Sequence, residues 1–414
     1  MNSPSQDTLP AHADPEAEQL FYSIMVSSGD DLYANYQRLR ETAPALLTSD
    51  GTLVLSRFAD CSDALRHRAL GKGDEFMRLK FAPVSPEQLN AVLEHLQRSM
   101  IMINPPDHTR IRGHVNAGFT GGHVEALRAS VTERAERLLE KLAAEPGGDF
   151  VSGFALALPS GVICDLLGVP EADRAALTPH ILDLALLVQA TPTEEQLGRG
   201  VAAAASLADY FTGLLKEKHA NPADDMLSRL VATRDGDGLD DGEVLSTALL
   251  FFLAGNKTTA DMLGNALHAI VTHPDKLAEL RADPSVIPTA ADELLRFDGP
   301  MQLNARTVLE PVTIAGADLE PGKAVIILQG AANHDPERFE NPEEMDLRRT
   351  NNGHLAFSSG IHFCTGAQLA KLEIEVLLST VFLGYSEVSF TETPERYPGV
   401  GMRYFEELRV SLKR

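Results

Sequence analysis

The sequence predicts a mainly α protein with a small β part, folded as a single large domain. Helical patterns dominate from Pro105 to Leu280, short β-like runs follow Arg296, and no linker or internal repeat divides the 414 residues. The hydrophobic content of 44% is ample for a large core. We therefore expect one domain over residues 21–414, preceded by a polar, disordered arm over residues 1–20.

Composition excludes several classes of protein. A net charge of -23 and the lack of a long basic run argue against nucleic acid as a partner. The three cysteines, Cys61, Cys164 and Cys364, are odd in number and widely spaced, which indicates a reducing compartment and neither a disulfide framework nor a multi-thiolate zinc site. The apolar run at 248–255 is much shorter than the ~20 residues of a membrane span, and the N-terminus lacks a signal peptide. We expect a cytoplasmic protein with no membrane partner.

The individual elements follow from local patterns. Before residue 105 we expect a helix over 31–47, a strand over 52–56, a helix from residue 58 and a long loop over 71–86. After Arg296 we expect β structure at 306–316 and 323–331, an irregular segment over 333–354, a helix after Cys364 and a final strand near 403–412.

A long central helix is predicted over residues 240–273. Asp240 and Glu243 have the spacing of a capping box, and the helix is long enough to cross a whole domain. Its middle, AGNKTT, holds Gly255 and Thr258, whose hydroxyl can bond back to the carbonyl of Ala254. The small residues indicate either a close helix contact or a pocket for a small ligand. Lys257 lies beside them, and Asp261 follows at the spacing of an ion pair.

Glu293 and Arg296 lie three residues apart on a predicted helix, a spacing that suits a salt bridge. Arg349 belongs to an irregular, arginine-rich stretch further along the chain. We expect Arg349 to complete a network with Glu293 that fixes this stretch.

The segment FSSGIHFCTG, residues 357–366, leaves three roles open for Cys364. The cysteine precedes a predicted helix, whose N-terminal amides and dipole favour thiolate, and Gly360 and Gly366 permit close approach. These features suit a metal ligand below a flat group. A buried, unreactive cysteine is the commonest alternative. A nucleophile with His362 or His354 as base is the other, although no oxyanion site is evident.

Phe357, Gly360, His362, Cys364 and Gly366 match the Phe-x-x-Gly-x-His-x-Cys-x-Gly signature, so the chain resembles the cytochrome P450 superfamily, in particular its soluble bacterial members. AGNKTT, the Glu-x-x-Arg pair, ANHDPERF and NPPDHTRIR match in the family's order, so the resemblance covers about residues 20–414. It implies the cytochrome P450 fold and haem b (iron protoporphyrin IX) as cofactor.

The resemblance implies roles for individual residues. Cys364 would be the thiolate ligand of the haem iron, on a loop that includes Phe357 and Gly366. The haem propionates would be held by four residues, His108, Arg112, Arg306 and His362. Thr258 would assist protonation of bound oxygen, in space left by Ala254 and Gly255. Glu293, Arg296 and Arg349 would form the structural network behind the haem.

Three positions depart from the family pattern. Lys257 stands where the family usually has Asp or Glu, and a lysine is a donor without acceptor capacity. Either waters or another group would then relay protons, or the reaction is atypical. Ser358 replaces a usual glycine and Thr365 a usual aliphatic residue.

The resemblance implies a monooxygenase that uses dioxygen to hydroxylate or epoxidise a medium-sized, largely apolar small molecule. Peroxide-driven, nitric-oxide-using or oxidative-coupling chemistry is an alternative, and a haem-based sensor without turnover is another. Electrons would come from a separate ferredoxin and its reductase, received at a basic patch of Arg66, Arg110 and Lys371. Candidate pocket residues are Phe76, Met77, Ile101, Leu187, Leu250, Phe251, Met301, Gln302, Leu303, Asn304 and Met402.

Overall fold

The chain is described as a computed structural model over residues 14–26, 29, 31–73, 96–188, 193–232, 238–398 and 401–414. Residues 1–13 of the predicted arm, most of the predicted loop over 71–86, and Phe76 and Met77 lie outside the described residues.

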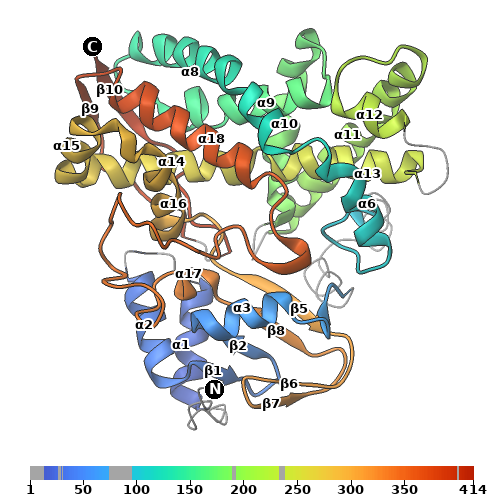
Figure 1. The fold of residues 1–414 in the computed structure, drawn as a ribbon, viewed down its shortest axis with the longest axis vertical. Helices are drawn as coiled ribbons and strands as arrows, with labels where there is room; N and C mark the ends of the chain where they lie inside the picture. The colour runs from blue at the N-terminus through green and yellow to red at the C-terminus, as the bar shows by residue number, and fades with distance from the viewer. Residues whose placement is uncertain are drawn as a thin grey trace.

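A smaller, β-containing part lies below a larger helical part in Figure 1. The smaller part combines the first elements of the chain with a segment from its last third. Its elements are α1 (Pro15–Val26), α2 (Leu32–Thr42), β1 (Ala45–Leu47), β2 (Leu53–Leu55), α3 (Phe58–Arg66), β3 (Leu70–Gly71), β5 (Asn304–Val308), β6 (Val312–Ile314), β7 (Ala317–Leu319), β8 (Ala324–Ile327) and α17 (Gln329–Ala332).

The main sheet of this part has the strand order β1-β2-β8-β5-β3. Strand β2 pairs in parallel with β8, in the register Leu53 to Val325, while β5 is antiparallel to β8. The β structure predicted at 306–316 is confirmed in β5 and β6, and that at 323–331 only in β8, because residues 329–332 form α17. The predicted helix over 31–47 is wrong in its last turn, because residues 45–47 form strand β1 against β2.

The larger part is helical, with a small sheet of β4 (Gly148–Asp149), β9 (Glu387–Phe390) and β10 (Arg409–Lys413). Its helices and short turns are α6 (Asp107–Asn116), α7 (Gly121–Ala126), α8 (Arg128–Ala143), η1 (Val151–Ala155), α9 (Ala157–Leu167), α10 (Glu171–Ala185), η2 (Leu186–Val188), α11 (Glu194–Ala220), α12 (Met226–Ala232), α13 (Asp241–Ala254), α14 (Lys257–Thr272), α15 (Pro274–Ala282), η3 (Pro284–Val286), α16 (Ile287–Asp298), η4 (Gly360–His362), α18 (Ala367–Leu377) and η5 (Leu378–Phe382).

The predicted disordered arm over residues 1–20 needs correction in its described part. Helix α1 begins at Pro15, within the range assigned to the arm. Ala17, Phe21 and Ile24 recur at helical spacing and pack with residues of α2 and β2 in one buried cluster. The burial of this apolar face is what orders residues 15–20.

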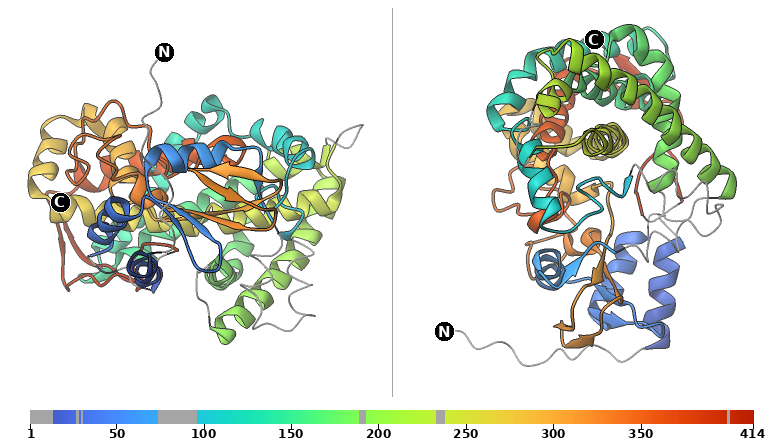
Figure 2. Two further views of the ribbon diagram at one scale, coloured as in Figure 1. Left: turned by 90° about the horizontal axis from the view of Figure 1, so that it is seen from below. Right: turned by 90° about the vertical axis from the view of Figure 1, so that its right-hand side faces the viewer.

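The predicted central helix is present but not continuous. It consists of α13 and α14, separated by Gly255 and Asn256. The right-hand view of Figure 2 shows this pair end-on, surrounded by an arc of helices. Asp240 and Glu243 form the predicted capping box, with the Glu243 amide 2.9 Å from Asp240 Oδ1 and the Asp240 amide 3.0 Å from Glu243 Oε2. The ladder breaks where the small, polar residues AGNKTT replace helix formers.

No helix among the described ranges is long and apolar enough to cross a membrane.

Candidate functional site

Cys364 lies on a loop that is closed by backbone contacts. Its amide donates to the carbonyl of Phe357 at 2.9 Å, and α18 begins three residues later at Ala367. Gly360 has a φ of +70°, and a Cβ there would approach the carbonyl oxygen of Leu65 to 2.6 Å. The glycine is required by both its conformation and this close approach.

The two other small positions of the loop differ from each other. Ser358 also has a positive φ, +62°, where the family's usual glycine would be relaxed. Gly366 has an ordinary φ, and within 4 Å a Cβ there would meet only Cys364 Sγ, at 4.0 Å. Among the described residues no other atom outside its chain neighbours lies within 4 Å of that Cβ position, so Gly366 is compatible with a flat group beside the sulfur.

The charge state of Cys364 depends on opposing effects. Burial among protein atoms raises the pKa of the thiol, while the Gly366 amide and the Arg112 guanidinium lower it. Cys364 as a whole residue is nevertheless exposed to solvent. The Gly366 amide acts in the direction expected of a helix N-terminus, towards thiolate, and burial acts against it.

Nitrogen atoms from three segments gather next to this loop. His108 and Arg112 come from α6, Arg306 from β5 and His362 from the cysteine loop. The rings of His108 and His362 lie 4.5 Å apart, and Arg112 donates to the carbonyl of Phe363. Both ring nitrogens of His108, Nε2 of His362 and Nη2 of Arg306 are buried without a hydrogen-bond partner in the described part of the chain.

The pKa shifts follow from this crowding of donors. Burial and the surrounding cations lower the pKa of His362 to about 2. Burial lowers the pKa of Arg306 to about 10 and also that of Arg112. Burial and Arg112 lower the pKa of His108. A group of buried nitrogen atoms without hydrogen-bond partners among the described residues suits a bound anion.

Lys72 belongs to the same group and was missed by the sequence reasoning. Burial and Arg306 lower its pKa to about 7, and Lys72 in turn acts on His362. Two hydrogen bonds to the Asn104 side chain, of 2.9 and 2.8 Å, fix its backbone. The only sequence signal was a lysine between Gly71 and Gly73 after a strand.

These residues fit the haem that the resemblance implies. Haem b carries two carboxylates, which match the unpartnered donors of His108, Arg306 and His362, and its iron accepts one soft thiolate. Cys364 would supply that thiolate, with its sulfur 4.0 Å from the position of a Cβ on Gly366.

The break between α13 and α14 holds the remaining predicted site residues. Thr258 Oγ1 donates to the carbonyl of Ala254 at 2.7 Å, as expected from the sequence. Ala254, Gly255 and Thr258 are half-buried, although neighbouring α13 residues are buried. A Cβ on Gly255 would lie 2.4 Å from Ile163 Cδ1, so the glycine is also a close helix contact. The close helix contact is therefore confirmed, and the ligand pocket beside Thr258 stays a prediction.

Lys257 forms the predicted ion pair with Asp261. Its ammonium also lies 3.4 Å from the centroid of the Tyr404 ring. Asp261 is buried, and burial raises its pKa to about 6 against the opposing effect of Lys257. The sequence offered no signal for Tyr404, because it lies far along the chain.

Glu293, Arg296 and Arg349 meet as expected. Arg296 donates to both carboxylate oxygens of Glu293, at 2.9 and 2.8 Å, and Arg349 Nε donates to one at 3.0 Å. The bidentate partner is thus Arg296. Arg296 also donates to the carbonyls of Asn333, Pro342 and Glu344, which pins the irregular segment to α16.

The predicted basic patch is less positive than the sequence suggested. Arg66 pairs with Asp63 at 2.8 Å, and Lys371 pairs with Asp292 at 2.8 Å. Arg110 pairs with Glu243. Because each cation has an acidic neighbour, the local potential is lower than three free cations would give.

The predicted pocket residues lie in different environments. Leu187, Leu250 and Phe251 are buried in the main core. Leu303 instead packs against the cluster around α1 and α2, and Ile101 is exposed. Met301 and Met402 lie opposite each other in an isolated β-bridge. Gln302 is buried and donates to the carbonyl of Gly299, while Asn304 accepts from Arg306.

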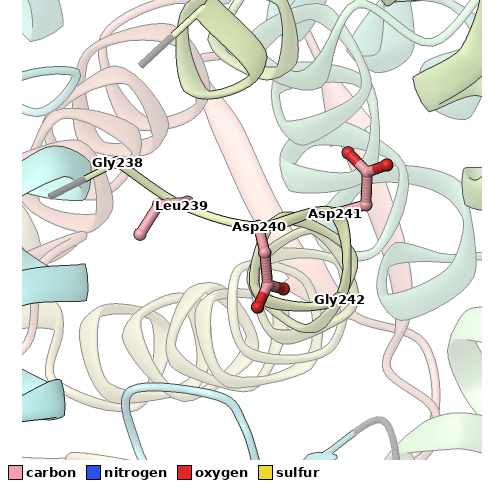
Figure 3. A pocket seen from close by; sticks show the side chains of 5 residues that line it. All are labelled: Gly238, Leu239, Asp240, Asp241 and Gly242. Carbon is pink, nitrogen blue, oxygen red and sulfur yellow. The ribbon is translucent and has the colours of Figure 1, made fainter. Parts of the chain in front are cut away.

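A separate shallow pocket lies at the start of α13, as Figure 3 shows, lined by Gly238, Leu239, Asp240, Asp241 and Gly242. Asp240 is already engaged in the capping box and in an ion pair with Arg98. The pocket is about 20 Å along the helix from Ala254, at 1.5 Å per residue. It is not part of the site around Cys364.

Comparison with known proteins gives consistent matches. A family model described as Cytochrome P450 matches residues 179–400. Cytochrome P450 monooxygenase PikC of Streptomyces venezuelae is 35% identical, over 93% of this chain and 92% of that protein. The biotin biosynthesis cytochrome P450 of Bacillus subtilis is 34% identical, over 78% of this chain and 82% of that protein. The crystal structure of P450BioI in complex with hexadec-9Z-enoic acid ligated acyl carrier protein matches with a TM-score of 0.85 at 30% identity, over 92% of this chain and 98% of that one.

Proposed function

We propose residue roles and a substrate class for this chain, which belongs to the cytochrome P450 family and is an oxidoreductase of the monooxygenase type with haem b as cofactor. The observation that supports the assignment of residues is the group of buried, unpartnered nitrogen atoms beside Cys364. When bound, haem supplies the activation of dioxygen.

In this proposal Cys364 holds the iron through its sulfur, and Phe357 fixes the loop through its carbonyl. His108, Arg112, Arg306 and His362 hold the propionates, joined by Lys72. Two bound carboxylates would give these buried donors hydrogen-bond partners. We therefore expect haem binding to stabilise the folded protein.

On the other face, Ala254 and Gly255 leave room beside the break in the central helix, and the Thr258 hydroxyl holds a proton there. That hydroxyl donates its hydrogen bond to the Ala254 carbonyl. Turning toward a reacting group would therefore cost one hydrogen bond. Excluding bulk water from this wall favours proton transfer through ordered groups.

The proposed substrate is a medium-sized, largely apolar molecule from secondary metabolism, hydroxylated or epoxidised with dioxygen. Apolar Leu250, Phe251, Met301 and Met402 support this size and polarity. The relative named for biotin biosynthesis and the structure with a fatty acid on acyl carrier protein make a carrier-bound fatty acyl chain a sensible first choice. Electrons would come from a ferredoxin and its reductase.

The test is the spectrum of the reduced, carbon-monoxide-bound protein. We expect wild type to show the red-shifted thiolate Soret band and Cys364→Ala to lose it, with helical content kept in far-UV circular dichroism. A wild-type protein without that band would end the proposal. If Cys364→Ala kept it, another residue would be the ligand.

Lys257 motivates a test of the alternative, a peroxide-driven or oxidative-coupling enzyme. Product formation with ferredoxin, reductase and NAD(P)H is compared with product formation from hydrogen peroxide alone. Turnover only with peroxide would replace the dioxygen-dependent proposal.

A further inference from the structure

The position of Lys257 is not explained by helix stability. Lys257 is the first residue of α14, where the helix dipole disfavours a cation. Its partner Asp261 follows four residues later, and a basic residue before an acidic one is the less favourable order of an i, i+4 pair. A further contact must therefore account for the placement of the ammonium.

That contact is the Tyr404 ring. The ammonium of Lys257 lies 3.4 Å from the ring centroid, and Tyr404 is buried. The side chain of Lys257 is only 18% exposed and that of Asp261 2%, so both the ion pair and the cation–π contact are shielded from water. Tyr404 is stacked on Tyr397 at 4.7 Å, which fixes the plane of the ring.

Tyr404 belongs to a segment that borders the proposed substrate site. Met402 lies opposite Met301, and the Arg403 amide donates to the Pro300 carbonyl at 2.7 Å. Helix α14 contacts this segment at two positions, and the first is Lys257. Asn265, eight residues after Lys257, donates to the Arg403 carbonyl at 2.8 Å.

We infer that Lys257 is a positioning residue, which ties the first turn of α14 to the Met402–Tyr404 segment and thereby sets the shape of the substrate site. The inference rests on the proposed function. The ammonium is directed to Asp261 and Tyr404, whereas the adjacent Thr258 hydroxyl bonds to Ala254. Lys257 thus stands at the family's acidic position without taking over proton delivery.

The experiment uses the haem-loaded protein and two nitrogen ligands of different size. Imidazole tests access to the iron, and 4-phenylimidazole adds a ring that must fit against the distal wall. Spectral titration gives the Kd of each ligand for wild type, Tyr404→Leu, Lys257→Met and the double variant. We expect each single variant to change the Kd of 4-phenylimidazole about tenfold and the Kd of imidazole less than twofold.

The double variant should change the Kd of 4-phenylimidazole no more than either single variant, because both substitutions remove the same contact between Lys257 and Tyr404. Tyr404→Phe and Lys257→Arg keep a ring and a cation, so they should remain near wild type. Tyr397→Leu keeps the ring that Lys257 faces but removes its stacking partner, so it should change the Kd of 4-phenylimidazole less than Tyr404→Leu does.

Two results would overturn the inference. One is additive changes in the double variant. The other is an unchanged Kd of 4-phenylimidazole in Lys257→Met together with a loss of coupling between NAD(P)H use and product, which is the signature of proton delivery. Lys257→Met leaves Asp261 without its cation, so Tyr404→Leu, which keeps the ion pair, decides the matter if Lys257→Met fails to fold.

Failure of this inference is distinguishable from failure of the proposed function. A wild-type protein that gives no imidazole shift and no thiolate band with carbon monoxide would refute the function. Normal wild-type spectra with no effect of Tyr404→Leu on 4-phenylimidazole would refute only the positioning role.

Discussion

Two groups of buried nitrogen donors differ in one respect. Around Glu293, the donors of Arg296 reach a carboxylate and three carbonyls. Around Cys364, buried nitrogens of His108, Arg306 and His362 have no partner in the described chain. The first group is complete within the protein and serves the fold. We propose that the second is completed by a bound anion and serves a ligand.

The comparison predicts that breaking the complete group costs most. Glu293→Gln leaves the buried Arg296 charge unpaired and should lower the free energy of unfolding by about 3–5 kcal/mol. Denaturant unfolding of the haem-free protein measures this.

Glu279→Gln is the control for Glu293→Gln. Glu279 pairs at 2.9 Å with Arg348, which is 52% exposed, so its loss should cost about 0–1 kcal/mol. Equal costs for the two variants would contradict the distinction between a buried and a surface pair.

Removing a cation from the incomplete group should have opposite effects with and without haem. Arg306→Met should leave the unfolding free energy of the haem-free protein unchanged or raised, because it removes a buried charge without an acid. Loss of one charge-assisted hydrogen bond, about 1.5–3 kcal/mol, should speed haem transfer to apomyoglobin about 10- to 100-fold. Destabilisation of the haem-free protein would refute the comparison; Arg348→Met should leave haem transfer unchanged.

The loop that carries Cys364 allows a smaller test, in which one substitution should destabilise the protein and another should stabilise it. Gly360→Ala should destabilise the haem-free protein by about 1–3 kcal/mol, because of its positive φ and the Leu65 carbonyl. Ser358→Gly should stabilise it by about 1 kcal/mol, since glycine relaxes the left-handed backbone. Thermal unfolding of both variants checks the signs, and an unfavourable effect of Ser358→Gly would contradict this account.

Glu373 in α18 presents the reverse case, an acid without a cation. Its Oε2 is buried with no hydrogen-bond partner in the described residues, and burial raises its pKa to about 8. The folded protein therefore favours the protonated acid, and the stabilisation present below the unfolded-state pKa is lost as pH rises toward about 8.

Glu373→Gln should consequently gain stability relative to wild type by at least about 1 kcal/mol between pH 5 and pH 8. Denaturant unfolding at these two pH values measures the difference. A difference that does not change with pH would mean that Glu373 is ionised in the folded protein.

The sequence predicted what short-range patterns encode. The capping box of Asp240 and Glu243, the bond from Thr258 to Ala254 and the pairing of Lys257 with Asp261 all involve residues three or four apart. Their geometry follows from the α-helix itself. Arg349 was found because it stood in a conspicuous, arginine-rich segment.

Contacts between distant segments were beyond this reasoning. Lys72 joins His362, and Tyr404 faces Lys257, without any periodicity that links the partners. The helix predicted over 31–47 ended early because β1 pairs with β2, a tertiary effect that local propensity does not contain. The acids beside Arg66, Arg110 and Lys371 were visible in the sequence only in part, since Asp292 and Glu243 are far from their partners.

The parallel pairing of β2 with β8 has a consequence for the newly made chain. Leu53 pairs with Val325, 272 positions later (325 minus 53). At roughly 5–20 residues per second, a ribosome needs about 14 to 54 s to synthesise that interval. During this time β2 has left the ribosome with one apolar edge unpaired, because its partner β8 has not been synthesised. Chaperones would protect the new chain most usefully in this interval.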